Sequence, residues 1–124
     1  MISHNLAQAR KSACLLVAWG FAVASIPAGA AIVTPSASVT VTKSYAYTAY
    51  EGGDFVFSTS GTVPGCESGW WIAASDPGFK SAVAAVLAAQ AAGSFIIVYG
   101  DPGALWSGSP SGQYCRVQTV GLTS

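Results

Sequence analysis

The sequence WWIAASDPGFKSAVAAVLAAQAAGSFIIVY, residues 70–99, determines the fold class, because it combines a strand, a helix and a second strand. Its aromatic beginning, residues 70–74, is typical of a strand. The alanine-rich centre predicts a helix over Phe79–Ala92 that ends at Gly93. The apolar run Phe95–Tyr99 then predicts a strand that is covered on both faces.

The four residues before this helix, Ser75-Asp76-Pro77-Gly78, are typical of a helix start. Proline suits the first turn, where its missing N–H group is not needed. Ser75 or Asp76 can accept hydrogen bonds from the free N–H groups of that turn. We therefore expect one of these two side chains to cap the helix.

The segments on either side of residues 70–99 are also predicted to be strands. Residues 31–60 largely alternate between apolar and polar side chains, with a turn at Glu51–Asp54. After a loop at residues 101–112, the last strand is expected over Tyr114–Leu122. Its alternation predicts Cys115, Val117 and Thr119 on one face, and Arg116 and Gln118 on the other.

One helix placed late among antiparallel strands favours an α+β fold or a small barrel over a repeated βαβ unit. We therefore predict a mainly β fold with one helix, an OB-fold-like small Greek-key barrel. A β-sandwich is the alternative, but it does not ordinarily include so long a helix.

The first 30 residues are predicted to be a secretory signal peptide. Arg10 and Lys11 supply positive charge, Ala13–Ile26 is apolar, and Ala28–Ala30 are small residues that suit cleavage. The apolar run is too short to cross a bilayer comfortably. We expect cleavage after Ala30 and a single secreted or periplasmic domain over residues 31–124, without stable membrane insertion. An N-terminal anchor that stays attached is the alternative.

Two cysteines, Cys66 and Cys115, remain after this cleavage. Because export leads to an oxidising compartment, we expect them to form a disulfide, with two free thiols as the alternative. The bond would close a loop of about 50 residues and contribute about 4 kcal/mol by the chain-entropy model. The histidine, His4, lies in the signal peptide, and there is no CxxC motif, so no metal and no cofactor are expected.

The charge of the mature region argues against nucleic-acid binding. Three cationic and five acidic side chains give it a net charge of −2. Nucleic acids and anionic membrane surfaces both favour proteins with clustered Lys and Arg. We therefore expect neither as a partner.

No combination of residues predicts a catalytic site. The mature region has no histidine to activate a serine, and a serine paired with Lys43 or Lys80 is less favoured. Two carboxylates could hydrolyse a glycoside, but Glu67, Asp76 and Asp101 lie beside Gly or Pro, or in turns and caps, where acidic residues are common. We predict no catalytic residue and no enzyme activity.

The predicted helix has an apolar side and a side of small residues. The expected core face consists of Phe79, Val83, Val86, Leu87 and Gln90. The other sides carry mostly alanine, with no charge after Lys80, and small side chains allow another backbone to approach closely. The predicted oligomer interface therefore consists of Ala85, Ala89 and Ala92. In the alternative, alanine supplies only helix propensity.

Aromatic residues are the best candidates for ligand contact, because their rings pack on sugars and on proteins. Trp70 and Trp71 are adjacent on a strand, so only one of them can enter the core. Trp106 lies in a loop of small residues and is predicted to lie in the core or in a seam between subunits, with a ligand surface as the alternative. The predicted ligand-binding residues are Tyr45, Tyr47, Tyr50 and Trp71.

The chain resembles the binding subunits of subtilase-cytotoxin and pertussis-like toxins over about residues 66–122. The resemblance is carried by Asp76-Pro77-Gly78-Phe79-Lys80, the helix after it, Gly93 before an apolar strand, Trp106 after that strand, and Cys115 in the last strand. Those proteins are small exported OB-folds that form pentameric rings and bind cell-surface glycans, often sialylated. The resemblance implies a homo-oligomer, a pentamer, that binds a surface glycan, and a separate catalytic subunit as a further partner. In the second hypothesis, the chain is a small exported structural or inhibitory protein that binds another protein through its exposed aromatic residues.

Overall fold

The computed structural model describes residues 33–124. The predicted signal peptide, residues 1–30, and its cleavage site lie outside the described residues. The elements in chain order are β1 (Thr34–Pro35), β2 (Val41–Ala46), the 3-10 helix η1 (Tyr50–Gly52), β3 (Phe55–Thr59), β4 (Gly69–Ile72), α1 (Phe79–Ala92), β5 (Ile96–Leu105) and β6 (Tyr114–Leu122). Within this part of the chain, no helix has the length and hydropathy that crossing a membrane requires.

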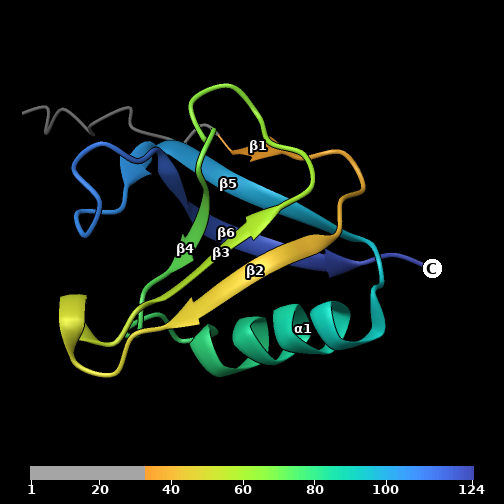
Figure 1. Ribbon diagram of the computed structural model, residues 1–124, viewed down its shortest axis with the longest axis horizontal. Coiled ribbons are helices and arrows are strands. Elements are labelled where there is room, and N and C mark those ends of the chain that lie inside the picture. Colours follow the sequence, from red (N-terminus) through yellow and green to blue (C-terminus); the bar gives the residue numbers. More distant parts are fainter. Residues whose placement is uncertain (1–32) are drawn as a thin grey trace, which may run out of the picture.

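The six strands of residues 33–124 form one mixed sheet in the order β1-β5-β6-β4-β3-β2. β4 and β6 run parallel, and the other neighbours run antiparallel. α1 packs against one face of this sheet, below β2 and β6 in Figure 1. The predicted α+β class, mainly β with one helix, is confirmed.

The sheet is not closed into a barrel, so the predicted closure is corrected. Its two edge strands, β1 and β2, follow each other in the chain, and between them Val39 forms an isolated bridge to Ile96 of β5. Two hydrogen bonds make this bridge, at 2.9 and 2.8 Å. β1 extends over two residues, and one of them, Pro35, has no N–H group to donate to a ladder.

The bounds of α1 agree with the prediction. Gly93 has φ of 66°, the left-handed conformation that glycine adopts readily, and its N–H group donates to the last carbonyls of the helix. The predicted cap at the other end is wrong. The residue at the N-cap position is Gly78, without any side-chain hydrogen bond, and the Asp76 carboxylate instead accepts one from Arg116 Nη2.

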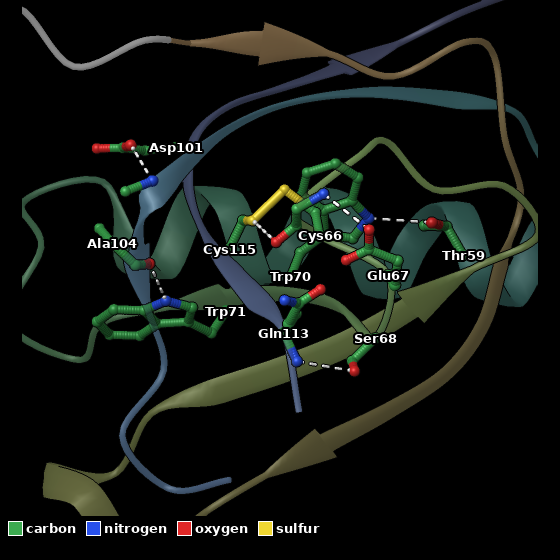
Figure 2. The surroundings of a disulfide bond; sticks show 12 residues. Thr59, Cys66, Glu67, Ser68, Trp70, Trp71, Asp101, Ala104, Gln113 and Cys115 are labelled. Carbon is green, nitrogen blue, oxygen red and sulfur yellow. Dashed lines mark hydrogen bonds between the residues drawn. A yellow bond between two sulfur atoms is a disulfide. The ribbon is translucent and has the colours of Figure 1, made fainter. Parts of the chain in front are cut away.

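The core lies between the sheet and α1. Trp70 is fully buried, and its Nε1–H donates to Thr59 Oγ1 at 3.0 Å, whereas Trp71 is half-buried on the other face (Figure 2). The prediction that only one of the two tryptophans enters the core is confirmed. The predicted disulfide between Cys66 and Cys115 is also confirmed, and it joins the β3–β4 connection to β6 with a Cα–Cα distance of 5.2 Å.

Two helix residues face the opposite way from the prediction. Leu87, expected in the core, is 46% exposed, and Ala89, expected on the outer face, is 1% exposed. The helix is rotated so that Val86 and Ala89 meet the sheet, and Gln90 Oε1 accepts a hydrogen bond from Ser44 of β2 at 2.7 Å. An alanine at the contact lets the helix approach the sheet more closely than a leucine would.

Two expectations for the last strands are corrected as well. The run Phe95–Tyr99 is not covered on both faces, because Ile96 and Val98 of β5 are buried while Phe95, just before β5, and Tyr99 are exposed. In β6, the predicted alternation is wrong from Thr119 onwards. The register shifts so that Tyr99 pairs with Thr119 and Gly100 with Val117, which leaves Gln118 without a partner across β5. This bulge turns Thr119 to the surface.

We expect Gly100→Ala to lower the free energy of unfolding by about 1–3 kcal/mol, because overpacking a core carries that cost. An added Cβ would lie within 2.7 Å of Trp70 Cε3. In the control variant Gly121→Ala, the added Cβ meets its nearest atom at 3.8 Å, so a neutral or slightly stabilising effect is expected. Urea denaturation measures both, and equal stability of the two variants would contradict this packing.

Candidate functional site

Five aromatic side chains lie together at one end of the molecule, and we call them the aromatic cluster: Tyr45, Tyr47, Tyr50, Trp106 and Tyr114. Tyr47 and Trp106 are the closest pair, with ring centroids 5.1 Å apart. Tyr50 and Tyr114 lie 6.3 and 5.9 Å from Trp106, each in an edge-on arrangement. Tyr45 lies 6.5 Å from Tyr47. The structure thus brings the three predicted tyrosines together.

The cluster forms where two connections of the sheet meet. Tyr45 belongs to β2, and Tyr47 and Tyr50 follow it in the β2–β3 connection, which contains η1. Trp106 directly follows β5, and Tyr114 opens β6. Both connections lie at the same end of the sheet in Figure 1.

Asp54 holds Trp106 in place. Trp106 is buried, and its Nε1–H donates to Asp54 Oδ2 at 3.1 Å. The other oxygen of this buried carboxylate accepts the Ala74 N–H at 3.0 Å. The Asp54 carbonyl accepts the Tyr47 N–H at 3.0 Å. The prediction that Trp106 is a buried structural residue is therefore confirmed, and its ring supports the tyrosines.

A second link joins the two connections at the surface. Ser107 Oγ donates to Glu51 Oε2 at 2.6 Å. Glu51 has φ of 50°, which is uncommon for a residue with a side chain. Backbone strain of this kind persists where surrounding contacts hold it. Here the hydrogen bond from Ser107 is such a contact.

The exposure of the rings to solvent differs across the cluster. Tyr45 and Tyr50 are 50% and 54% exposed, Tyr47 and Tyr114 are half-buried, and Trp106 lies beneath them. Exposed ring faces can stack on the apolar face of a ligand, and phenol hydroxyls can donate and accept hydrogen bonds. Over residues 33–124, no group of three or more His, Cys, Asp or Glu side chains could hold a metal ion.

Trp71 is not part of the cluster. Its Nε1–H donates to the Ala104 carbonyl at 3.0 Å, as Figure 2 shows. The Arg116 guanidinium lies over its ring at 5.5 Å. The polar atom and one ring face of Trp71 therefore already have partners within the chain. Its predicted role in ligand binding stays a prediction.

The three predicted interface residues differ in their exposure to solvent. Ala89 belongs to the core, whereas Ala85 is half-buried and Ala92 is exposed. Ala92 borders a shallow hollow of about 240 Å³, which Leu122 also lines. The interface prediction therefore still applies to the exposed Ala92 and the half-buried Ala85, and not to the buried Ala89.

Sequence patterns missed several residues of the site. Asp54 follows two glycines and was expected only in a turn, and Tyr114 was expected only as part of the last strand. Glu51 and Ser107 contact each other across 56 residues of sequence. One sequence signal could have identified Asp54. The glycine pair Gly52-Gly53 predicts a turn between Tyr50 and Asp54, which brings the carboxylate close to the tyrosines.

Comparisons with protein-family models, curated proteins and solved structures found no match to this chain. The functional assignment therefore depends on the geometry of the aromatic cluster.

We expect Trp106→Ala to lower the free energy of unfolding by about 3–5 kcal/mol, the usual cost of removing a buried tryptophan. Trp106→Phe keeps a ring but leaves Asp54 Oδ2 without its donor. Its cost should be smaller, about 1–3 kcal/mol. Thermal or urea denaturation of both variants tests this order. A melting curve of Trp106→Ala that overlays that of the wild type would show that Trp106 does not support the site.

Proposed function

We propose that the chain is an exported, non-enzymatic binding protein that holds a cell-surface glycan on the aromatic cluster. The observation that carries this proposal is the pair of half-exposed rings, Tyr45 and Tyr50: Tyr50 lies against the buried Trp106, and Tyr45 is linked to it through Tyr47. Rings that are held in place lose little conformational entropy when a ligand binds. Sugars offer apolar ring faces and many hydroxyls, and the tyrosines offer the matching faces and hydrogen-bonding groups.

The topology supports an OB-fold-like arrangement as part of this proposal. β1 and β2 can be taken as two halves of one bent first strand, because the Val39 bridge to Ile96 joins them. The order of strands, the parallel β4–β6 pair and the helix between β4 and β5 then agree with a partly open five-stranded barrel. In OB-folds, the loops after the first and the fourth strand bind oligonucleotides and oligosaccharides. These loops correspond to the two connections that form the aromatic cluster.

The charge of the chain favours an oligosaccharide over an oligonucleotide. Residues 31–124 have a net charge of −2, and the exposed tyrosines have one charged neighbour of each sign: Glu51 accepts a hydrogen bond from Ser107, and Lys43 Nζ lies 6.0 Å from the centroid of the Tyr45 ring. Oligonucleotide binding draws much of its affinity from cationic side chains that displace counterions. A neutral sugar does not require them.

The disulfide supports the export of the chain, since such bonds are typical of oxidising compartments. The resemblance to toxin binding subunits adds a homo-oligomeric ring to the proposal. The outer face of α1 supports it, because Leu87 is exposed there among alanines and no ionisable residue follows Lys80 in the helix. A second copy of an uncharged surface is a suitable partner for such a face.

Tyr50→Ala should weaken glycan binding by about 1–3 kcal/mol, as removal of an aromatic anchor does. Tyr50 is exposed, so the melting temperature should hardly change. A glycan array selects the ligand, and calorimetry with that ligand measures the affinity. Tyr99→Ala is the matched control, because Tyr99 is a 38% exposed tyrosine of β5 outside the cluster.

Tyr50→Phe separates the contribution of the ring from that of the hydroxyl. The proposal fails if the array gives no ligand, or if Tyr99→Ala reduces the affinity as much as Tyr50→Ala does. An array without ligands, together with a protein partner lost in Tyr50→Ala, would instead support the second hypothesis, a protein-binding role.

Ala92→Glu should dissociate the proposed oligomer into folded monomers, because an unpaired carboxylate buried between subunits is costly. The same charge at exposed Thr62, in Thr62→Glu, serves as the control. Light scattering after size exclusion gives the mass of each variant. A monomeric wild type would contradict the proposed ring and leave glycan binding untouched.

A further inference from the structure

A groove of about 450 Å³ lies between the first turn of α1 and β6. Its polar side chains are the Asp76–Arg116 ion pair, Gln118 and Thr119. Its apolar lining consists of Ile72, Pro77, Ala82, Val117 and Val120. The groove shares no residue with the aromatic cluster, so it is a second candidate site.

β6 has an unpaired flank along this groove. Its parallel neighbour β4 pairs with it only as far as Trp71 and Arg116. Between residues 33 and 124, no other strand continues this pairing. Gln118 also lacks a partner across β5, because of the bulge. The groove therefore offers backbone N–H and C=O groups of a strand as well as side chains.

The chemistry of the lining matches a peptide better than a charged small molecule. Asp76 and Arg116 pair with each other, and the other lining side chains are uncharged, so the groove has no net charge. Arg116 is also held against the Trp71 ring. The strand flank, the Gln118 amide and the Thr119 hydroxyl supply both donors and acceptors. A peptide backbone carries one donor and one acceptor at almost every residue.

We propose that this groove binds an extended segment of a partner protein, which adds to β6 as a further strand. Strand addition of this kind takes its affinity from main-chain hydrogen bonds and its specificity from pockets for alternate side chains. The unpaired residues 117–120 span about 10 Å at the usual rise of a strand, enough for about four peptide residues. Apolar side chains at alternate positions of the peptide meet the accessible apolar lining, Pro77, Ala82 and Val120. The proposal is independent of glycan binding.

The test uses a phage-displayed library of random heptapeptides, selected on the purified protein. Gly78→Trp blocks the groove, because Gly78 lines it, has φ of −91° and would hold a Cβ with no atom within 4 Å. Thr119→Trp blocks the opposite wall from an exposed position, in case the first variant does not fold. Ala91→Trp adds the same side chain to an exposed part of α1 outside the groove and is the control.

Selected peptides should bind the wild type and Ala91→Trp equally and lose about tenfold or more in affinity on a folded blocking variant. N-methylation of alternate peptide nitrogens should abolish binding, and the bound peptide should slow hydrogen exchange in residues 117–121. The proposal is overturned if no peptide is selected, if the blocking variants bind as tightly as the wild type, or if exchange slows only in the aromatic cluster. Pairing of two copies of this chain through the groove would also overturn it.

Discussion

The packing of Trp70 against Gly100 is the constraint on which the sheet depends. Trp70 lies on β4, opposite Cys115 of β6, and Gly100 lies on β5, opposite Val117. A side chain at Gly100 would overlap the indole. The register of β4, β5 and β6 therefore has to place a glycine, Gly100, against Trp70, the largest residue of the core. The disulfide from Cys115 to Cys66 covalently joins the same region to the β3–β4 connection.

This centre leaves the ends of the sheet free for other tasks. At one end, the buried Asp54 of the β2–β3 connection accepts hydrogen bonds from Trp106 Nε1 at the start of the β5–β6 connection and from the Ala74 N–H of the β4–α1 connection. A buried carboxylate is costly unless hydrogen bonds satisfy it, and here both of its oxygens have donors. The exposed tyrosine rings are thus available to contact a ligand, because the residues beneath them make the site rigid.

The sequence predicted what local patterns control. Alanine propensity and Gly93 located α1, alternation located β6, and two cysteines in a chain predicted to be exported implied their bond. What failed depends on contacts between distant residues. The Asp76 carboxylate does not cap the helix but pairs with Arg116, 40 residues away in the sequence. The register shift between β5 and β6, which places Thr119 at the surface, has no signal in the local sequence pattern.

The prediction of which face of α1 meets the core was wrong for a related reason. Leu87 and Ala89 are both compatible with a helix, and the choice between them depends on how closely the helix approaches the sheet. The aromatic cluster was predicted in part, since three tyrosines lie near each other in sequence, but the contacts of Tyr47 and Tyr50 with Trp106 span the two connections. Proximity in sequence predicted the tyrosines, and only the fold could supply the residue that supports them.

Trp71 connects the two candidate sites. Its Nε1–H bonds Ala104, two residues before Trp106, and its ring carries Arg116, which lines the groove. A side chain with both of these contacts positions the β5–β6 connection on one side and the guanidinium on the other. Because side chains alternate along β4, the two adjacent tryptophans point to opposite faces of the sheet and have different roles. Trp70 fixes the core, and from the opposite face of β4 Trp71 contacts one residue next to each candidate site, Ala104 and Arg116.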